Sequence, residues 1–329
     1  MTDVRARLAA ADLAQQVARL GFREDDDDAV LAAARAVLES GDELARVATM
    51  VSGLQAAIGD FTFGDPDPWP DPGAEGSRFG VGVLPLLALL VTAPDVAAFH
   101  QQRGISEDVS WGSLADLGQQ AWVHRQTYGE FGLHTYPWLR IAWSGALHWL
   151  GRLQFNLQVT DGEWVLSTHI PAVGPLTPAA VDDSLRRARG FFAEHFPDYP
   201  TSDFYCSSWL LDPELAAALA PESNLASFQR RWRLYGEPMR GDSDVLFFTF
   251  FRRGPVDLAT LPQETSLQRA VVARLESGRH WHVWQGRIPQ SALDSGPALD
   301  SGPALDSASA KPAGPGPGSA GSATSEVSR

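Results

Sequence analysis

The stretch Gly-Arg-Leu-Gln-Phe-Asn-Leu-Gln-Val, residues 151–159, decides the fold of this chain because the hydrophobic pattern changes there. Its apolar residues alternate strictly with polar ones: Leu153, Phe155, Leu157 and Val159. Such alternation predicts a half-buried β-strand. Asp161 and Gly162 follow and suit the positive φ values of a tight hairpin turn. Residues 163–170 are therefore predicted to return as a second strand.

Downstream of the hairpin, helix and strand signals succeed one another to about residue 288. Thr177 and Pro178 are the cap and first residue of a predicted helix, and Asp212 and Pro213 start another in the same way. A capping box, Thr265-Ser-Leu-Gln268, opens a third helix. The predicted strands of this region are 203–211, 230–235, 244–251 and 279–288. One strand–helix–strand crossover within a mostly antiparallel, mixed sheet predicts an α/β fold of the α+β kind.

Upstream of the strand signal, the chain reads as helices throughout. The longest apolar run, Val81–Ala93, contains Pro85 and is shorter than the ~20 residues of a membrane span, so it is predicted as a buried core helix. Residues 138–150 are predicted as the last helix. Residues 1–148 are therefore expected to form a helical N-terminal domain.

The end of the chain differs in composition from the rest. It repeats Ala-Leu-Asp-Ser-Gly-Pro and then continues in Gly, Pro, Ser and Ala, which bury no core. Residues 290–329 are predicted to be a disordered low-complexity tail, and residues 149–289 remain as the C-terminal domain.

Composition excludes several classes of function. A net charge of −14 argues against nucleic-acid and anionic-membrane partners, which need clustered cations. The only lysine is Lys311, in the predicted tail, so the folded body cannot supply a Schiff-base or phosphate-loop lysine. One cysteine and the absence of a signal-peptide pattern at the N-terminus predict a cytoplasmic protein.

Several segments between residues 81 and 288 resemble a known family. They are Leu150-Gly-Arg-Leu-Gln-Phe155, His169-Ile-Pro-Ala-Val-Gly-Pro-Leu-Thr-Pro178, Phe191-Phe-Ala-Glu-His-Phe-Pro197, Cys206-Ser-Ser-Trp-Leu-Leu-Asp-Pro213, Ser223-Asn-Leu-Ala-Ser-Phe-Gln-Arg-Arg231, Leu261-Pro-Gln-Glu-Thr-Ser-Leu-Gln-Arg-Ala270 and Gly278-Arg-His-Trp-His282. The chain resembles actinobacterial acyltransferase-domain proteins, which pair a helical N-acyltransferase N-terminal domain with a GNAT-like C-terminal domain.

The resemblance implies acyl-CoA as cosubstrate, with no metal. In GNAT enzymes the loop after one strand turns its N–H groups to the pyrophosphate, and the next helix points its N-terminus at the same charge. Strand 163–170, loop 171–176 and helix 177–195 have this layout. Only one glycine of the usual glycine-rich loop is present here, and prolines at three positions donate no N–H. The implied cofactor-binding residues are Val173, Gly174, Leu176, Thr177 and Asn224.

Two residues are candidates for the chemistry of acyl transfer. His169, at the end of a strand, could deprotonate the acceptor amine, although a packed strand histidine is the competing interpretation. Tyr235 could reprotonate the leaving thiolate or merely pack across strands. Cys206 is interpreted as a buried strand residue, and Asp212 as a helix cap.

Two functions follow as hypotheses. The first is an N-acyltransferase that moves an acyl group from acyl-CoA to a small-molecule or peptide amine. The alternative is a non-catalytic module that binds acyl-CoA or a partner protein through a degenerate site. His280 and His282 face one side of a predicted strand, but no third ligand is apparent, so packing is favoured over a metal site.

Overall fold

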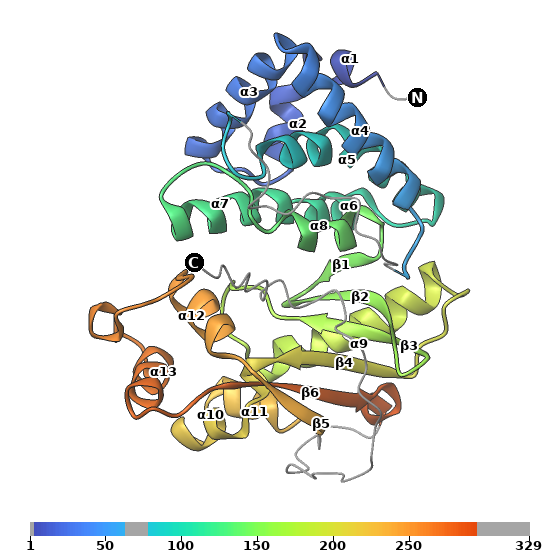
Figure 1. The fold of residues 1–329 in the computed structure, drawn as a ribbon. Helices are drawn as coiled ribbons and strands as arrows, with labels where there is room; N and C mark the ends of the chain where they lie inside the picture. Colours follow the sequence, from blue (N-terminus) through green and yellow to red (C-terminus); the bar gives the residue numbers. More distant parts are fainter. Residues whose placement is uncertain (1–2, 63–77, 295–329) are drawn as a thin grey trace. The chain divides into compact units, whose positions relative to one another are not determined.

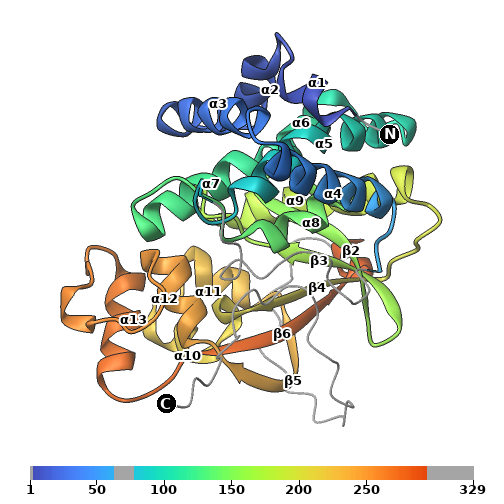
Figure 2. The ribbon, with the colours of Figure 1, turned by 45° about the horizontal axis from the view of Figure 1, so that its top comes forward.

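The computed structural model describes residues 3–62 and 78–294. The chain divides into two compact units, Met1–Trp149 and Leu150–Arg329, each described by itself (Figures 1 and 2). Most of the predicted tail, from residue 295 on, lies outside the described residues. Its first five residues, Gln290–Asp294, form the short 3₁₀ helix η3.

The first unit is helical in its described part, as predicted. Its helices are α1 (Val4–Leu8), α2 (Leu13–Arg19), α3 (Glu24–Leu38), α4 (Gly41–Ala57), α5 (Val83–Gln102), α6 (Glu107–Leu114), α7 (Asp116–Tyr128) and α8 (Tyr136–Trp143). By length and composition α5 could cross a membrane, yet 72% of its apolar window is buried inside the protein. The other helices of the unit supply the residues that pack around it. The prediction of a core helix in this region is confirmed.

The predicted helix at residues 138–150 is wrong in its second half. Helix α8 ends at Trp143, and strand β1 (Leu147–Leu150) follows. Gly145 explains the break because its φ of 86° is left-handed, a conformation that other residues rarely adopt. A Cβ atom at this position would also lie 2.5 Å from the ring of Phe99.

The second unit is built on a mixed sheet with the strand order β1-β2-β3-β4-β6-β5. Its strands after β1 are β2 (Leu153–Thr160), β3 (Glu163–His169), β4 (Asp203–Ser208), β5 (Arg233–Arg240) and β6 (His282–Pro289). The hairpin between β2 and β3 turns at Asp161 and Gly162, with φ values of 56° and 82°. Strands β3 and β4 are parallel and are joined through helix α9 (Pro178–His195), so the predicted fold class is confirmed.

The sheet of this unit has an apolar face and a polar face, because residues paired across strands share a side. The apolar face consists of buried residues: Phe155, Leu157, Leu166, Phe204, Cys206, Leu234 and Ile288. Helix α9 packs against β2 and buries the stripe of Val181, Leu185, Ala188 and Phe192. The polar face includes Gln154, Asn156, Glu163, Ser167, His169, Asp203, Tyr205, Ser207, Arg233, Tyr235, Gln285 and Arg287.

The remaining elements of the unit are short. They are η1 (Trp209–Leu211), α10 (Pro213–Ala218), α11 (Asn224–Gln229), α12 (Asp242–Phe250), η2 (Leu258–Thr260) and α13 (Ser266–Glu276). The capping box of Thr265 and Gln268 is confirmed at the start of α13. The strand predicted at 244–251 is wrong, because these residues form α12. A short apolar run fits a strand or a buried helix equally well, and here Val245 and Phe250 enter a core with α10 and α13.

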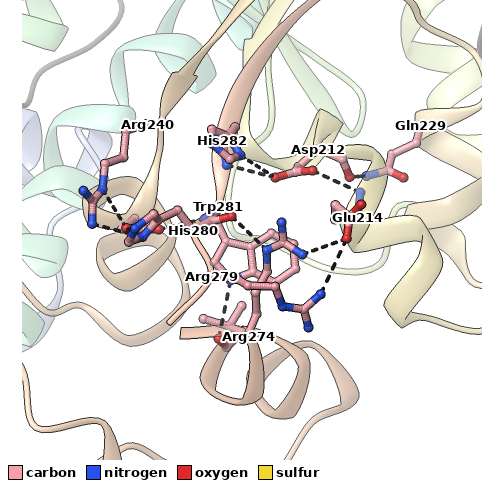
Figure 3. Close-up of polar contacts among 11 residues, drawn as sticks. Asp212, Glu214, Gln229, Arg240, Arg274, Arg279, His280, Trp281 and His282 are labelled. Carbon is pink, nitrogen blue, oxygen red and sulfur yellow. Dashed lines mark hydrogen bonds and ion pairs between the residues drawn. The ribbon is translucent and has the colours of Figure 1, made fainter. Parts of the chain in front are cut away.

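Two aspartates fasten the start of β6 to the helices around it (Figure 3). Asp212 is 1% exposed; one of its oxygens caps α10 at the amide of Glu214, and the other accepts the amide of His282 at 2.9 Å. Asp242 accepts the amide of Trp281 at 2.8 Å. Asp212 is therefore a structural cap, as its sequence context predicted.

We expect Asp212→Ala to lower the free energy of unfolding by roughly 2–4 kcal/mol, the sum of a lost cap and an unpaired buried amide. Asp212→Asn keeps one acceptor oxygen and should lose less. Denaturant unfolding at pH 7 measures both variants. Equal stability of Asp212→Ala and the parent protein would contradict this role.

Candidate active site

The parallel pairing of β3 and β4 stops before either strand ends. Its two residue pairs are Leu166 with Phe204 and Ser167 with Tyr205. Strand β3 continues to His169 and β4 to Ser208, and no further β3–β4 pair occurs among the described residues. We call residues 168–169 and 206–208 the open end of the β3–β4 pair. The main-chain N–H and C=O groups at this end do not pair β3 with β4. They are therefore suited to hydrogen-bond an extended ligand that carries amide groups.

The loop after β3 leads directly into the N-terminus of α9. Thr177 caps the helix through the amide of Ala180, and Gly174 takes a left-handed φ of 59°. The amide of Val173 donates to the carbonyl of Pro171 at 2.8 Å, so it is already engaged. The amides of Gly174, Leu176 and Thr177 donate to no residue in the described part of the chain. Together with the positive end of the 18-residue helix, they form a place that favours an anion.

Arg152 holds this loop, and no sequence signal pointed to it. Its guanidinium donates to the carbonyl of Gly174 at 3.0 Å and to that of Pro175 at 3.3 Å. Its own amide donates to Ser184 Oγ of α9 at 2.7 Å. Arg152 and Gly174 are far apart in sequence and meet only because α9 packs on the sheet. The side chain therefore fixes the loop and places a positive charge beside it.

His169 contacts a second buried side chain on the polar face. Its Nε2 lies 2.6 Å from Asn156 Oδ1, and Asn156 Nδ2 donates to the carbonyl of Leu157 at 2.7 Å. Burial lowers the pKa of His169 to about 3, so the ring is neutral at physiological pH. Gln154 pairs with His169 across the hairpin, and its buried Nε2 has no hydrogen-bond partner among residues 3–62 and 78–294. Sequence reasoning found the histidine but missed both amides.

Two tyrosines share the polar face with His169. Tyr235 accepts from Arg287 Nε at 3.3 Å, while Arg287 also binds Asp161 at 2.8 Å and Asp203 at 3.3 Å. Burial raises the pKa of Tyr235 and of Tyr205, so both phenols keep their protons at neutral pH. Strand order puts β5, with Tyr235, three strand spacings from β3, which is roughly 14 Å. Tyr205, on β4, is on the neighbouring strand.

The other residues singled out in the sequence belong to other elements of the unit. Asn224 is the first residue of α11, whose cap is Ser223. His280 Nδ1 lies 2.8 Å from Asp242, whereas the amide of His282 binds Asp212, so the two histidines have separate acidic partners (Figure 3). Within the described residues, no group of three or more His, Cys, Asp or Glu side chains could hold a metal ion.

Comparison with known proteins agrees with this architecture. Residues 11–145 match the N-acyltransferase N-terminal domain, and residues 147–288 match the GNAT-like C-terminal domain. An acyltransferase solved in complex with decanoyl-CoA is 35% identical, with a TM-score of 0.79 over 85% of this chain and 88% of that one. The chain belongs to this acyltransferase family. The resemblance to proteins with an N-acyltransferase N-terminal domain and a GNAT-like C-terminal domain is thereby confirmed.

Further acyltransferase structures are similar to the same extent. One, in complex with CoA and 10C-teicoplanin, is 34% identical, with a TM-score of 0.77 over 85% of this chain and 88% of that one. Another, in complex with decanoyl-CoA and teicoplanin, is 36% identical, with a TM-score of 0.75 over 84% and 87%. A comparison with curated proteins gave no match.

Cys206 lies at the open end, but its thiol is unsuited to nucleophilic chemistry in this acyltransferase. The residue is 1% exposed, and burial raises the pKa of the thiol to about 12. We expect no reaction with Ellman's reagent in the native protein at pH 8, and one equivalent after unfolding, because the chain has a single cysteine. Rapid labelling of the native protein would contradict the burial and reopen a covalent mechanism.

Proposed function

We propose that this acyltransferase transfers an acyl group from a medium-chain acyl-CoA to an amine of a peptide-based acceptor of the glycopeptide kind. The observation that carries the proposal is the early end of the β3–β4 pairing beside the N-terminus of α9. The family supports the reaction, and similar acyltransferases were solved with decanoyl-CoA and with teicoplanin.

The chain offers a separate group for each part of acyl-CoA. The amides of Gly174, Leu176 and Thr177, with the helix terminus, suit the pyrophosphate, and Arg152 adds a positive charge near it. The main-chain groups of the open end suit the amide-containing arm. Asn224 is kept as a candidate contact for the same arm, and Val173 contributes shape rather than a free amide.

The polar face offers groups for the chemistry. In the proposed reaction the acceptor nitrogen attacks the thioester carbonyl carbon, so that a C–N bond forms and the C–S bond breaks. His169 takes the proton that the nitrogen loses, since its neutral ring has a lone pair. A phenol then protonates the thiolate. Tyr235 is the candidate from sequence, and Tyr205 is the candidate nearer to β3.

One observation favours the non-catalytic alternative. Three prolines in and after the loop donate no N–H, and the amide of Val173 is engaged, so fewer donors remain than in a glycine-rich loop. Such a site could bind acyl-CoA weakly without turnover. Formation of an acylated product distinguishes the enzyme from the binding module.

The first test is product formation. We expect the protein, decanoyl-CoA and a teicoplanin-type amine to give one amide per CoA thiol released, measured by mass spectrometry and a thiol assay. His169→Gln should lower kcat by about 10²–10⁴-fold because a general base is lost. His280→Gln, on a histidine bound to Asp242, is the matched control and should keep the parent rate. Full activity of His169→Gln would remove this residue from the mechanism.

The second test concerns the loop. Arg152→Ala should raise the KM for acyl-CoA by about 10- to 100-fold, with a smaller change in kcat, because charge-assisted hydrogen bonds that shape the loop are lost. Arg187→Ala removes a 61% exposed arginine of α9, paired with Asp183, and serves as the control. An unchanged KM in Arg152→Ala would show that the anion site lies elsewhere.

A further inference from the structure

Asn156 is a polar residue in the middle of a buried strand. It is 1% exposed, and its neighbours Phe155 and Leu157 belong to the apolar face. Burial of a carboxamide costs free energy unless its hydrogen bonds are made. Both ends of this amide are in contact, one with the carbonyl of Leu157 and the other with His169. A residue needed only for packing would not require this polarity.

The contact with Leu157 decides which way the amide points. A main-chain carbonyl can only accept, so the atom 2.7 Å from it must be the NH₂ group of Asn156. The oxygen Oδ1 therefore faces His169 Nε2 at 2.6 Å. Because that oxygen can only accept, Nε2 of the histidine must carry a hydrogen.

The contact also decides the tautomer of His169. A neutral imidazole holds one hydrogen, so with Nε2 protonated the basic lone pair belongs to Nδ1. The choice of tautomer exists only for a neutral ring, and burial keeps the ring of His169 neutral by lowering its pKa. The other titratable or charged groups of the polar face are Glu163 of β3, Asp161 of the hairpin turn, and Asp203, Tyr205, Arg233, Tyr235 and Arg287 of β4, β5 and β6.

We propose that Asn156 is the positioning residue of this active site: it holds His169 in the tautomer whose Nδ1 accepts the proton of the attacking amine. The inference rests on the proposed function. In the step, the amine nitrogen forms the C–N bond and gives its proton to Nδ1, the C–S bond breaks, and the thiolate takes a proton from a phenol. Asn156 itself exchanges no proton and keeps the ring orientation fixed throughout.

Two variants separate this role from a structural one. Asn156→Leu and Asn156→Asp both lose the hydrogen bond to Leu157, but only Asp keeps an acceptor toward Nε2. Thr92→Val is the matched control, because Thr92 is 0% exposed in α5 of the helical unit and its hydroxyl donates to the main-chain carbonyl of Ala88. Melting temperatures show whether each variant is folded.

The first readout needs no substrate. In protein labelled with ¹⁵N-histidine, assigned by comparison with His169→Gln, we expect the ring of His169 to carry its proton on Nε2. Thr92→Val should keep this pattern, and Asn156→Leu should lose it. A proton on Nδ1 in the parent protein would overturn the inference, whether or not the protein proves to be a transferase.

The second readout is the pH dependence of acyl transfer. Asn156→Leu should lower kcat on the order of ten- to a hundredfold, as loss of a histidine-orienting partner does, with little change in KM. In Asn156→Asp the carboxylate favours the charged ring and raises its pKa by about one to three units. In this variant kcat should then fall as the pH drops from about 6 to about 4, because the ring of His169 becomes protonated. The parent protein should show no such fall in this range. A folded Asn156→Leu with parent kcat, or an Asn156→Asp profile identical to the parent's, would overturn the role.

Discussion

The parallel contact between β3 and β4 is the constraint on which the rest of the C-terminal unit depends. Past Ser167 and Tyr205, each strand is paired, within the described part of the chain, only with its other neighbour: His169 with Gln154 of β2, and Ser208 with Trp284 of β6. The sheet thus consists of two halves, β1-β2-β3 and β4-β6-β5, joined by the two residue pairs between β3 and β4. Each strand keeps its pairing on the outer side, so the main-chain groups of the inner edges at the open end are available to a ligand.

The short pairing of β3 with β4 also determines where the groups proposed for acyl-CoA binding and for catalysis lie. The β3–α9–β4 crossover brings the N-terminus of α9 to the end at which the strands separate, and Arg152 fastens the intervening loop to this helix. Alternation along the strands sends Asn156, His169 and Tyr205 to one face and the core residues to the other. The groups proposed for anion binding and for proton transfer are therefore both positioned by the β3–α9–β4 crossover.

Local patterns in the sequence predicted most of the fold, and they failed where long-range contacts decide the outcome. Alternation predicted β2, Asp161 and Gly162 predicted the hairpin, and capping residues predicted the starts of α9, α10 and α13. The apolar run at 244–251 was predicted as a strand because its hydrophobic pattern fits a strand or a buried helix equally well. Packing of Val245 and Phe250 in the core decides for the helix. For the candidate site, His169 and the loop were predicted from the family resemblance and its strand–loop–helix layout. The roles of Arg152 and Asn156 could not be predicted from the sequence, because they depend on partners that come close only in the folded sheet.

Hydrogen–deuterium exchange with and without decanoyl-CoA tests the central claim most directly. We predict that a saturating concentration slows exchange at the amides of Gly174, Leu176 and Thr177 and of residues 206–208, while Arg233–Arg240 of β5, at the far edge of the sheet, exchanges as before. Unchanged exchange at both of these segments, with protection elsewhere in the chain, would contradict the account, because the ligand would then bind away from the open end of the β3–β4 pair.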